Sequence, residues 1–386
     1  MKILHFVRSV SEIYGTYTYL HNMREDMSKY DVEQIYLCYE PSKQNNKNVF
    51  NQSVTSLDQI DVDEFMEEEN PDIIHFHDVV SHYLITNDTK YREFYEYSKR
   101  KIRVRTLHDY SSVVCPNYLK YPEGIFCEEP VNETCVKKNC ISKELFDKYN
   151  EYLEEIKKYD GIFYFSDNVK NTMQKLGFNK DKSYYIPPLV KEQQDFSEGK
   201  KNNILFVGRI ANEKGLVDLL HAAALLKTDN WHLYIAGADS MKYLKYLLKL
   251  ADNLKIINKV EFLGFLPHEK LKPYFLDSKI MSFPSTCRET YGFSGAEAVS
   301  YGIPVVTYDI QGINNWSIDG YTVISVPNHN VHALASAMDL LLSDNNVYKD
   351  YQANCREWSR NLDYQGQIKK MYDLYSKILN KKHQSI

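Results

Sequence analysis

The feature that most constrains the fold is an alternation of short apolar runs with longer helical patterns. In the first half, buried strands are predicted at Ile3–Val7, Gln34–Tyr39, Ile73–Phe76, Val104–Leu107 and Gly161–Phe165. Helical patterns lie between them at Gly15–Met27, Asp61–Glu69, Lys90–Arg100 and Lys143–Lys158. Strands separated by helices of this length predict parallel βαβ crossovers in a doubly wound sheet.

The same alternation starts again after two prolines in Tyr184–Val190 and a polar linker at Lys191–Asn203. Strands are predicted at Ile204–Val207, His232–Ala236, Lys259–Phe262, Ile280–Phe283 and Val305–Tyr308. The helical patterns are Gly215–Leu226, Met241–Ile256, Gly295–Tyr301 and His332–Leu342. A chain of 386 residues is too long for one typical hydrophobic core and long enough for two domains. We therefore predict one domain over 1–190, with a cysteine-containing loop at 110–142, a second over 191–362, and a terminal helix over 363–386 that packs back toward the first.

Charge and composition exclude several classes of protein. The formal net charge of -5 does not fit a nucleic-acid-binding domain. The opening MKILHFVRSV is a strand rather than a signal peptide, and no run of about 18 apolar residues occurs, so a cytoplasmic protein is expected. Seven cysteines, an odd number without an export signal, do not indicate a disulfide framework. The dinucleotide fingerprint Gly-x-Gly-x-x-Gly is missing from the sequence.

Two cations follow the first strand of the second half. Arg209 and Lys214 lie in the turn between Gly208 and the helix that starts at Gly215. A guanidinium fork, a mobile ammonium and a helix N-terminus together suit a phosphate group. The alternative is that both are solvated loop residues.

The stretch RETYGFSGAE places Glu289 and Glu297 eight residues apart after a buried strand. Ser294 and Glu297 fit a capping box, which is the structural explanation for Glu297. Gly292 and Gly295 would let the backbone approach an anion closely. Glu289 has no helical neighbour to explain it, and a carboxylate can accept two sugar hydroxyl hydrogens.

These segments together resemble the family-4 retaining glycosyltransferases, which have the GT-B fold. The likeness is carried by the E-x7-E pair with PSTCR before it and AVSYGIPVV after it, by FVGRIANEKGLVDLLHAA, by VEFLGFLPHEKLKPYFLDSKIMSFPS and by IQGINNWSIDGYTVISVPNHNVHALASAM. PDIIHFHD and RTLHDY resemble segments of the family's first domain. The resemblance covers most of the chain and implies two Rossmann-like domains that face each other across a cleft.

The resemblance also implies roles for individual residues. Arg209, Lys214, Gly15, Gly292, Phe293 and Ser294 would hold the donor diphosphate, Glu297 the ribose, and Gly264, Phe265 and Leu266 the base; His108 and Glu289 would be catalytic. A core histidine is the alternative for His108. The family often has a double glycine in its first loop, whereas this chain has Gly15 alone.

The implied reaction moves a sugar from a nucleoside diphosphate, UDP or GDP, to a hydroxyl of a saccharide or lipid-linked acceptor in polysaccharide or glycoconjugate synthesis. Cations and helix ends would stabilise the leaving diphosphate, so no metal is expected to be required for catalysis. Asp61 and Asp63 form an Asp-x-Asp pair, but the pair lies at the start of a polar helix and not at the end of a strand, so it is interpreted as a charge pair at a helix N-terminus. No enzyme nucleophile is evident, which favours a front-side route assisted by the leaving phosphate.

Cys115, Cys127, Cys135 and Cys140 follow the HDY turn. Four thiolates suit a structural zinc ion, but no C-x-x-C pair occurs, so free or redox-labile thiols are the alternative. Some bacterial members of the family resemble this segment. In either case, we expect the segment to recognise the acceptor.

Other functions stay open. One is a nucleotide-sugar-binding protein without turnover, and another is a GT-B sugar-nucleotide epimerase; a phosphorylase would need a longer chain and a pyridoxal-bearing lysine. The basic run Lys99–Arg105 would suit contact with anionic lipid at the inner membrane face, but it overlaps a strand and is better explained by a solvated face.

Overall fold

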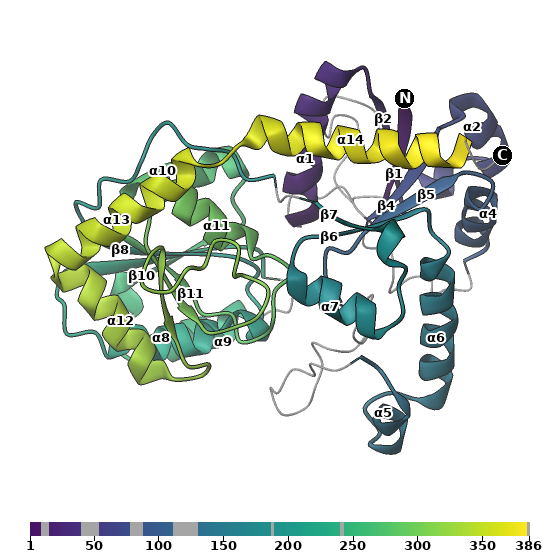
Figure 1. Cartoon of the computed structure of the whole chain (residues 1–386). Coiled ribbons are helices and arrows are strands. Elements are labelled where there is room, and N and C mark those ends of the chain that lie inside the picture. Colours follow the sequence, from purple (N-terminus) through teal and green to yellow (C-terminus); the bar gives the residue numbers. More distant parts are fainter. Residues whose placement is uncertain are drawn as a thin grey trace. The chain divides into compact units, whose positions relative to one another are not determined.

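The computed structural model describes residues 1–8, 15–39, 54–77, 88–110, 130–186, 189–239 and 243–383. The chain forms two compact units, one from 1–189 with 365–386 and the other from 190–364. Each unit is a parallel sheet with helices packed on it (Figure 1).

Unit 1 has a seven-stranded sheet in the order β3-β2-β1-β4-β5-β6-β7. Its strands are β1 (Lys2–Val7), β2 (Glu33–Cys38), β3 (Thr55–Ser56), β4 (Ile73–His77), β5 (Ile102–Thr106), β6 (Gly161–Tyr164) and β7 (Ser183–Tyr185). Its helices are α1 (Gly15–Met27), α2 (Val62–Glu69), α4 (Thr89–Ser98), α5 (Glu133–Lys137), α6 (Lys143–Lys157), α7 (Asp167–Lys175) and α14 (Tyr364–His383). The last of these, yellow in Figure 1, lies along this sheet near α1.

Unit 2 has a six-stranded sheet in the order β10-β9-β8-β11-β12-β13. The strands are β8 (Asn202–Val207), β9 (Trp231–Ala236), β10 (Val260–Gly264), β11 (Ile280–Phe283), β12 (Val305–Tyr308) and β13 (Val323–Val326). The helices are α8 (Leu216–Ala224), α9 (Leu244–Asn253), α10 (His268–Asp277), α11 (Phe293–Ser300), α12 (Val331–Ser343) and α13 (Asn345–Arg360).

The central strands are buried over most of their length because helices cover both faces of each sheet. Every residue of β4, β6, β11 and β12 is buried. The paired strands run parallel, as the alternation of strands and helices predicts. None of the helices within the described ranges is both long and apolar enough to cross a membrane.

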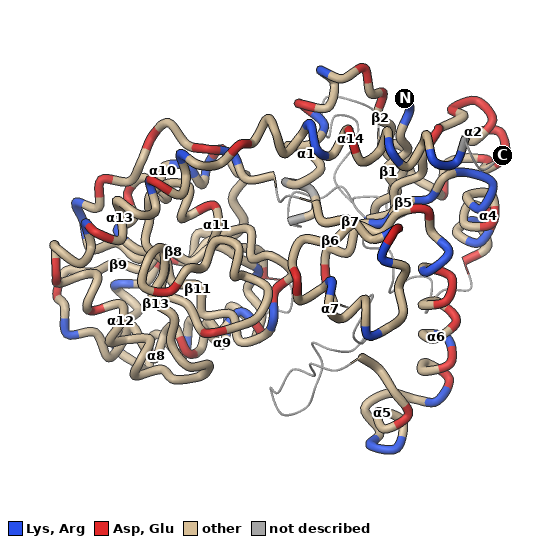
Figure 2. The backbone as a smooth tube through the Cα atoms, in the orientation of Figure 1, with Lys and Arg blue, Asp and Glu red and all other residues tan. Residues whose placement is uncertain are grey.

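The basic run Lys99–Arg105 divides where β5 begins: Lys99 and Arg100 are exposed, whereas Arg103 and Arg105 lie within the strand. Arg103 and Arg105 are 6% and 2% exposed. The Arg103 guanidinium lies 4.6 Å from the ring centre of Tyr159, and that of Arg105 lies 5.5 Å from the ring centre of Tyr152. Both interpretations drawn from sequence are therefore wrong for these two arginines, because aromatic side chains cover them. Exposed charges of both signs alternate instead along elements such as α6 (Figure 2).

Candidate functional site

The strand order of unit 2 sets a switch point between β8 and β11. Neighbouring strands there lead into connections on opposite sides, and in open α/β sheets ligands bind beyond the carboxyl ends at such a point. The segment after β8 carries Arg209 and Lys214, and the segment after β11 carries Glu289. The residues predicted from two separate motifs therefore follow adjacent strands.

Lys214 and Glu289 form a direct ion pair across this switch point. Lys214 Nζ lies 2.5 Å from Glu289 Oε1, and the side chains are only 19% and 15% exposed. The Ser285 hydroxyl donates to the same carboxylate oxygen at 2.7 Å. Burial opposes the charge on Lys214, but the Glu289 carboxylate outweighs that effect and raises the pKa of Lys214. Lys214 is thus held charged at neutral pH.

Two glycines allow the loops of this pair to approach each other. Gly215 has φ +69°, and a Cβ there would lie 1.9 Å from the carbonyl oxygen of Pro284. Gly312 has φ +95°, and a Cβ there would lie 1.5 Å from the carbonyl oxygen of Glu289. The Glu289 N–H also donates to the Gln311 carbonyl at 3.0 Å. The backbone around the ion pair is therefore fixed by contacts that only glycine permits.

Arg209 lies in the same segment and is more accessible than Lys214. Its side chain is 37% exposed, and its Nη2 lies 2.7 Å from Glu213 Oε1. The Glu213 carbonyl in turn accepts from the N–H of Thr286 at 2.9 Å, which ties the segment to the loop after β11. A guanidinium has five N–H donors, so the Glu213 contact leaves it with donors for phosphate oxygens.

The start of α11 differs from the sequence prediction. The N-cap is Gly292, with φ +76° and no side-chain cap bond, and Phe293 is the first helical residue. Ser294 is therefore the second residue of the helix, and the predicted capping box between Ser294 and Glu297 is wrong. The left-handed glycine starts the helix earlier than a serine cap would. The helix still presents an N-terminus at the switch point, where its partial positive charge favours anions.

Gly295 has a packing role in the structure, and the close approach to an anion suggested by sequence stays a prediction. A Cβ at this position would lie 2.1 Å from Trp316 Cη2. Trp316 is fully buried, and its indole N–H donates to the Tyr291 carbonyl at 2.6 Å. The tryptophan therefore supports the first turn of α11 from within the core.

Glu297 contacts a residue that the sequence analysis did not select. Its carboxylate is hydrogen-bonded to Nε2 of His268, the first residue of α10. The hydrogen bond to Glu297 raises the pKa of His268. His268 lies only two residues after the segment Gly264–Leu266 that was assigned to the base. This closeness in sequence is the signal by which His268 could have been predicted as a site residue. In that segment Gly264 has φ +67° and Phe265 is 38% exposed.

In unit 1, His108 follows β5 and is partly exposed. Its Nε2 lies 2.9 Å from Nδ1 of the buried His77, and the rings of Tyr19 and Phe165 lie within 5.5 Å between ring centres. Burial lowers the pKa of His108 to about 3, so the imidazole is neutral. Gly15 is the first residue of α1. The proposed sugar contact by His108 and diphosphate contact by Gly15 stay predictions.

The cysteine site also stays a prediction. Cys115 and Cys127 lie outside the described residues. Cys135 and Cys140 are joined by a backbone hydrogen bond of 2.8 Å from the Cys140 N–H to the Cys135 carbonyl, and both side chains are half-buried.

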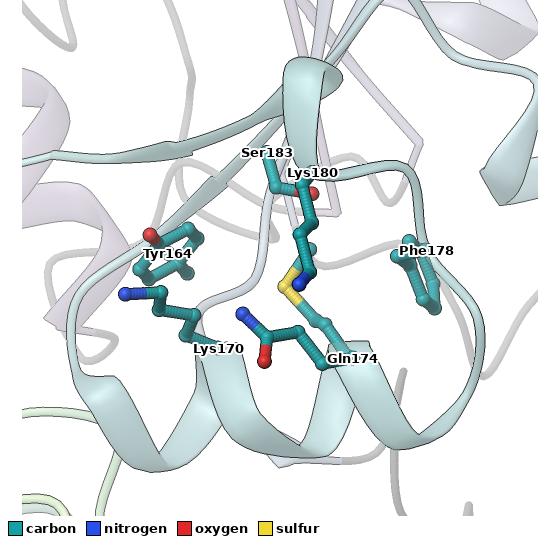
Figure 3. A pocket seen from close by; sticks show the side chains of 7 residues that line it. Tyr164, Lys170, Gln174, Phe178, Lys180 and Ser183 are labelled. Atoms are coloured by element: carbon teal, nitrogen blue, oxygen red, sulfur yellow. The ribbon is translucent and has the colours of Figure 1, made fainter.

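A separate hollow of about 350 Å³, open to solvent, lies in unit 1 beside α7 (Figure 3). Phe178 and Met173 form apolar walls, while Lys170, Lys180 and Gln174 bring polar ends to it. None of the predicted site residues lines it, and its lysines carry flexible, exposed ammonium groups. We therefore do not assign it to the candidate site.

Comparison with known proteins finds a family to which unit 2 is similar. Residues 190–358 match the family described as glycosyl transferases group 1. The match covers most of unit 2 but less than half of the chain, so it shows that unit 2 is similar to this family. Arg209, Lys214, Glu289 and Glu297 all lie within it.

Two relatives extend the comparison. An uncharacterized glycosyltransferase of Methanocaldococcus jannaschii is 33% identical over 156 residues, which cover 38% of this chain and 39% of that protein. The uncharacterized glycosyltransferase YqgM of Bacillus subtilis is 24% identical over 299 residues, which cover 76% of this chain and 83% of that protein. The chain therefore spans about two fifths of the first relative and most of the second.

Solved structures confirm the predicted fold class. Sucrose-phosphate synthase from Thermosynechococcus elongatus matches with a TM-score of 0.74 at 15% identity, over 99% of this chain and 100% of that one. Anabaena HepE, solved in complex with UDP-glucose, matches with a TM-score of 0.73 at 16% identity, over 98% of this chain and 100% of that one. At these identities the likeness shows the fold alone: two Rossmann-like domains of the GT-B type.

Proposed function

We propose that this protein is a retaining glycosyltransferase of the family-4 type, which moves a hexosyl group from a nucleoside-diphosphate sugar to an acceptor hydroxyl. The observation that carries the proposal is the buried Lys214–Glu289 pair at the switch point of unit 2. It places a cation and a carboxylate where a nucleotide ligand is expected in this kind of sheet.

The cations and the helix end suit the leaving group of such a reaction. As the glycosidic bond breaks, negative charge grows on the diphosphate. Arg209, Lys214 and the N-terminus of α11 supply positive charge that is already in position, which is the largest source of rate enhancement in many enzymes. Glu297 would accept the ribose hydroxyls, exchanging its contact with His268 for them.

Glu289 acts in this proposal as a contact to the donor sugar and the reacting centre. Its carboxylate already accepts hydrogen bonds from Lys214 and Ser285, which lowers its strength as a nucleophile. We therefore favour a front-side route, in which the departing phosphate takes the proton of the acceptor hydroxyl as the new bond forms on the same face. Two relatives support retention by their names, an alpha-D-kanosaminyltransferase of Streptomyces kanamyceticus and a poly(glycerol-phosphate) alpha-glucosyltransferase of Bacillus subtilis.

For the donor we propose a UDP-sugar ahead of a GDP-sugar, because HepE, a structural neighbour, was solved with UDP-glucose. For the acceptor we propose a saccharide or a lipid-linked saccharide, the second at the inner face of a membrane. His108 would contact the donor sugar from unit 1, and the cysteine-containing segment would recognise the acceptor.

The test is binding of UDP-, GDP- and ADP-sugars, measured by thermal shift and by calorimetry. One nucleotide should stabilise the wild-type protein, and Arg209→Ala and Glu297→Ala should each weaken that binding at least about tenfold, the loss of one charge-assisted contact. Lys272→Ala is the matched control, since Lys272 forms an exposed ion pair with Asp195 in the same unit.

Binding that is equally strong in the Lys272, Arg209 and Glu297 variants would contradict the assigned site. Binding that is lost as predicted, but without any release of sugar from the donor, would favour the nucleotide-sugar-binding protein without turnover.

A further inference from the structure

The carboxylate of Glu289 is held by one of its two oxygens. Both hydrogen bonds that it receives end on Oε1, one from Lys214 Nζ at 2.5 Å and one from the Ser285 hydroxyl at 2.7 Å. No donor within the described ranges reaches Oε2. A carboxylate oxygen can accept two hydrogen bonds, so Oε1 has its full number of donors while Oε2 keeps its whole capacity for a ligand.

The hydroxyl proton of Ser285 has three acceptors within reach, and the carboxylate is the strongest of them. The carbonyl oxygens of Glu213 and Cys287 lie 3.3 and 3.4 Å from the hydroxyl oxygen, compared with 2.7 Å for Glu289 Oε1. Hydrogen bonds between two oxygens are usually about 2.7–2.8 Å long, and an ionised acceptor makes them stronger. The single proton is therefore donated to Glu289.

A tie between the loop after β11 and the segment after β8 is the competing explanation for the Ser285 hydroxyl. That tie is already made by Thr286, whose N–H and hydroxyl both donate to the Glu213 carbonyl, at 2.9 and 3.2 Å. The side chain of Ser285 is buried, with 2% exposed, so its hydroxyl does not serve contact with water. The hydrogen bond to Glu289 is thus the contribution that Thr286 does not supply.

The backbone at both ends of this hydrogen bond is fixed. The carbonyl oxygen of Pro284, the residue before Ser285, lies 1.9 Å from the position of a Cβ at Gly215, so the two backbones pack directly on each other. At the other end, the Glu289 N–H donates to the Gln311 carbonyl at 3.0 Å. A hydrogen bond between two fixed backbone segments leaves the carboxylate little freedom to rotate.

We propose that Ser285 is a positioning residue, which acts with Lys214 to fix Oε1 of Glu289 and thereby presents Oε2 to a hydroxyl group of the donor sugar. Oε2 can accept that hydroxyl without losing an existing hydrogen bond. The inference rests on the proposed function, because the sugar is that of a nucleoside-diphosphate donor. It gives the two oxygens of one carboxylate different tasks: Oε1 holds the group in place, and Oε2 contacts the ligand.

The test compares Ser285→Ala with Ser282→Ala. Ser282 lies in β11, three residues before Ser285, and is also buried, but its hydroxyl has no hydrogen-bond partner among the residues that the structure describes. The two substitutions remove the same atom from buried positions, and only Ser285→Ala removes a donor from Glu289. Ser285→Ala should therefore lower the urea midpoint of unfolding more than Ser282→Ala does.

The rate is measured as release of sugar from UDP-glucose and from GDP-glucose without acceptor. Ser285→Ala should lower kcat about tenfold, the effect of losing one hydrogen bond to a charged group. The dissociation constant of the matching nucleoside diphosphate should change less than about twofold, because Ser285 makes none of the proposed phosphate contacts. Ser282→Ala should leave both quantities unchanged. A substitution that only loosened the loop would weaken nucleotide binding as well.

A double-mutant cycle with Glu289→Gln shows whether Ser285 acts through Glu289. The amide oxygen can accept from Lys214 and Ser285, but the amide NH2 group then lies where Oε2 was. No acceptor is left there for Ser285 to position. In the Glu289→Gln protein, the further change Ser285→Ala should therefore lower kcat less than about threefold, rather than tenfold again.

The possible outcomes separate the inference from the proposed function. Equal urea midpoints in Ser285→Ala and Ser282→Ala would overturn the hydrogen bond to Glu289. Wild-type kcat in Ser285→Ala, or a loss that multiplies with that of Glu289→Gln, would overturn the positioning role. No sugar release by the wild-type protein from a donor that binds would instead contradict the proposed function, and with it the task given to Oε2, while the urea midpoints would still decide whether Ser285 holds the carboxylate.

Discussion

Mild acid should unfold unit 1 before unit 2. His5, His75 and His77 are fully buried and neutral in the folded protein, and burial is the first cause of their lowered pKa values. In the unfolded chain each has its ordinary pKa of about 6.5. The unfolded state therefore binds more protons below pH 6.5, so stability is complete above that pH and is lost as the pH falls below it.

The size of the effect follows from four lowered pKa values in unit 1, because burial lowers that of His108 as well. Between pH 7.5 and 5.5, one histidine that cannot be protonated in the folded state costs about 1.4 kcal/mol of unfolding free energy. Four such residues cost about 5.5 kcal/mol, a large part of the 5–15 kcal/mol typical of a domain. In unit 2 the pKa of His268 is raised, so its contribution is present below about pH 6.5 and is lost as the pH rises through the raised value.

Tryptophan positions allow the two units to be followed separately. All three tryptophans, Trp231, Trp316 and Trp358, belong to unit 2. Urea unfolding at pH 7.5 and 5.5 should therefore show a nearly constant tryptophan fluorescence transition. The circular dichroism signal, which reports both units, should gain an earlier transition at pH 5.5. His5→Phe should reduce the pH effect on that transition by about one quarter.

Two results would refute this reasoning. Transitions by both probes that shift equally with pH would mean that acid sensitivity does not arise from the histidines of unit 1. An unchanged circular dichroism transition at pH 5.5 would mean that these imidazoles are protonated in the folded protein.

Glu289→Gln should lower the rate of glycosyl transfer about 100-fold. UDP binding should stay equal or become tighter, because Lys214 loses the carboxylate that competes with phosphate. Steady-state rates and calorimetry measure the two effects, and wild-type activity in this variant would contradict the assigned role of Glu289. Gly215→Ala should cost about 3 kcal/mol in urea unfolding, from its left-handed backbone and the contact with Pro284. Gly320→Ala is its control, with φ +75° and no atom within 4 Å of the new Cβ, and should cost only about 1 kcal/mol; equal losses in the two variants would show that the contact is unimportant.

Sequence periodicity was sufficient for the central strands of both sheets, whereas the edge strands β3, β7 and β13 were not predicted. Predicted strands Ile280–Phe283 and Val305–Tyr308 coincide with β11 and β12, and helix Gly15–Met27 coincides with α1. These segments combine a strong apolar pattern with clear turn residues at their ends, so local sequence and packing agree. Helix α10 was not predicted because Pro273 lies inside it, and prolines usually end a helix.

Residues of the candidate site could be predicted from sequence only where a local motif indicates the backbone conformation. Arg209, Lys214 and Glu289 follow strand ends, and the parallel order of the sheet then brings them together. The contact of Glu297 with His268 joins residues 29 positions apart on different helices, which no local pattern reveals. The start of α11 at Gly292 was missed because a serine followed by a glutamate mimics a capping box. Its true cause is a left-handed glycine packed against Trp316.

The cluster of buried histidines in unit 1 could not be predicted from sequence either. The sequence contains His5, His75 and His77 as ordinary strand residues, and His108 was selected by resemblance alone. Their contact depends on the register of β1 against β4, in which His5 pairs with His75. Only that register aligns the imidazoles on one face of the sheet, and register is not visible from one strand at a time.

The central claim, retaining glycosyl transfer, is tested most directly by proton NMR of slow donor hydrolysis with the nucleotide sugar that binds best. For an α-linked donor, the account predicts that the sugar first released is the α-anomer, and that Glu289→Gln largely abolishes the release. The β-anomer as the first product would contradict retention and the front-side route, and no release from a donor that binds would contradict the assignment as a glycosyltransferase.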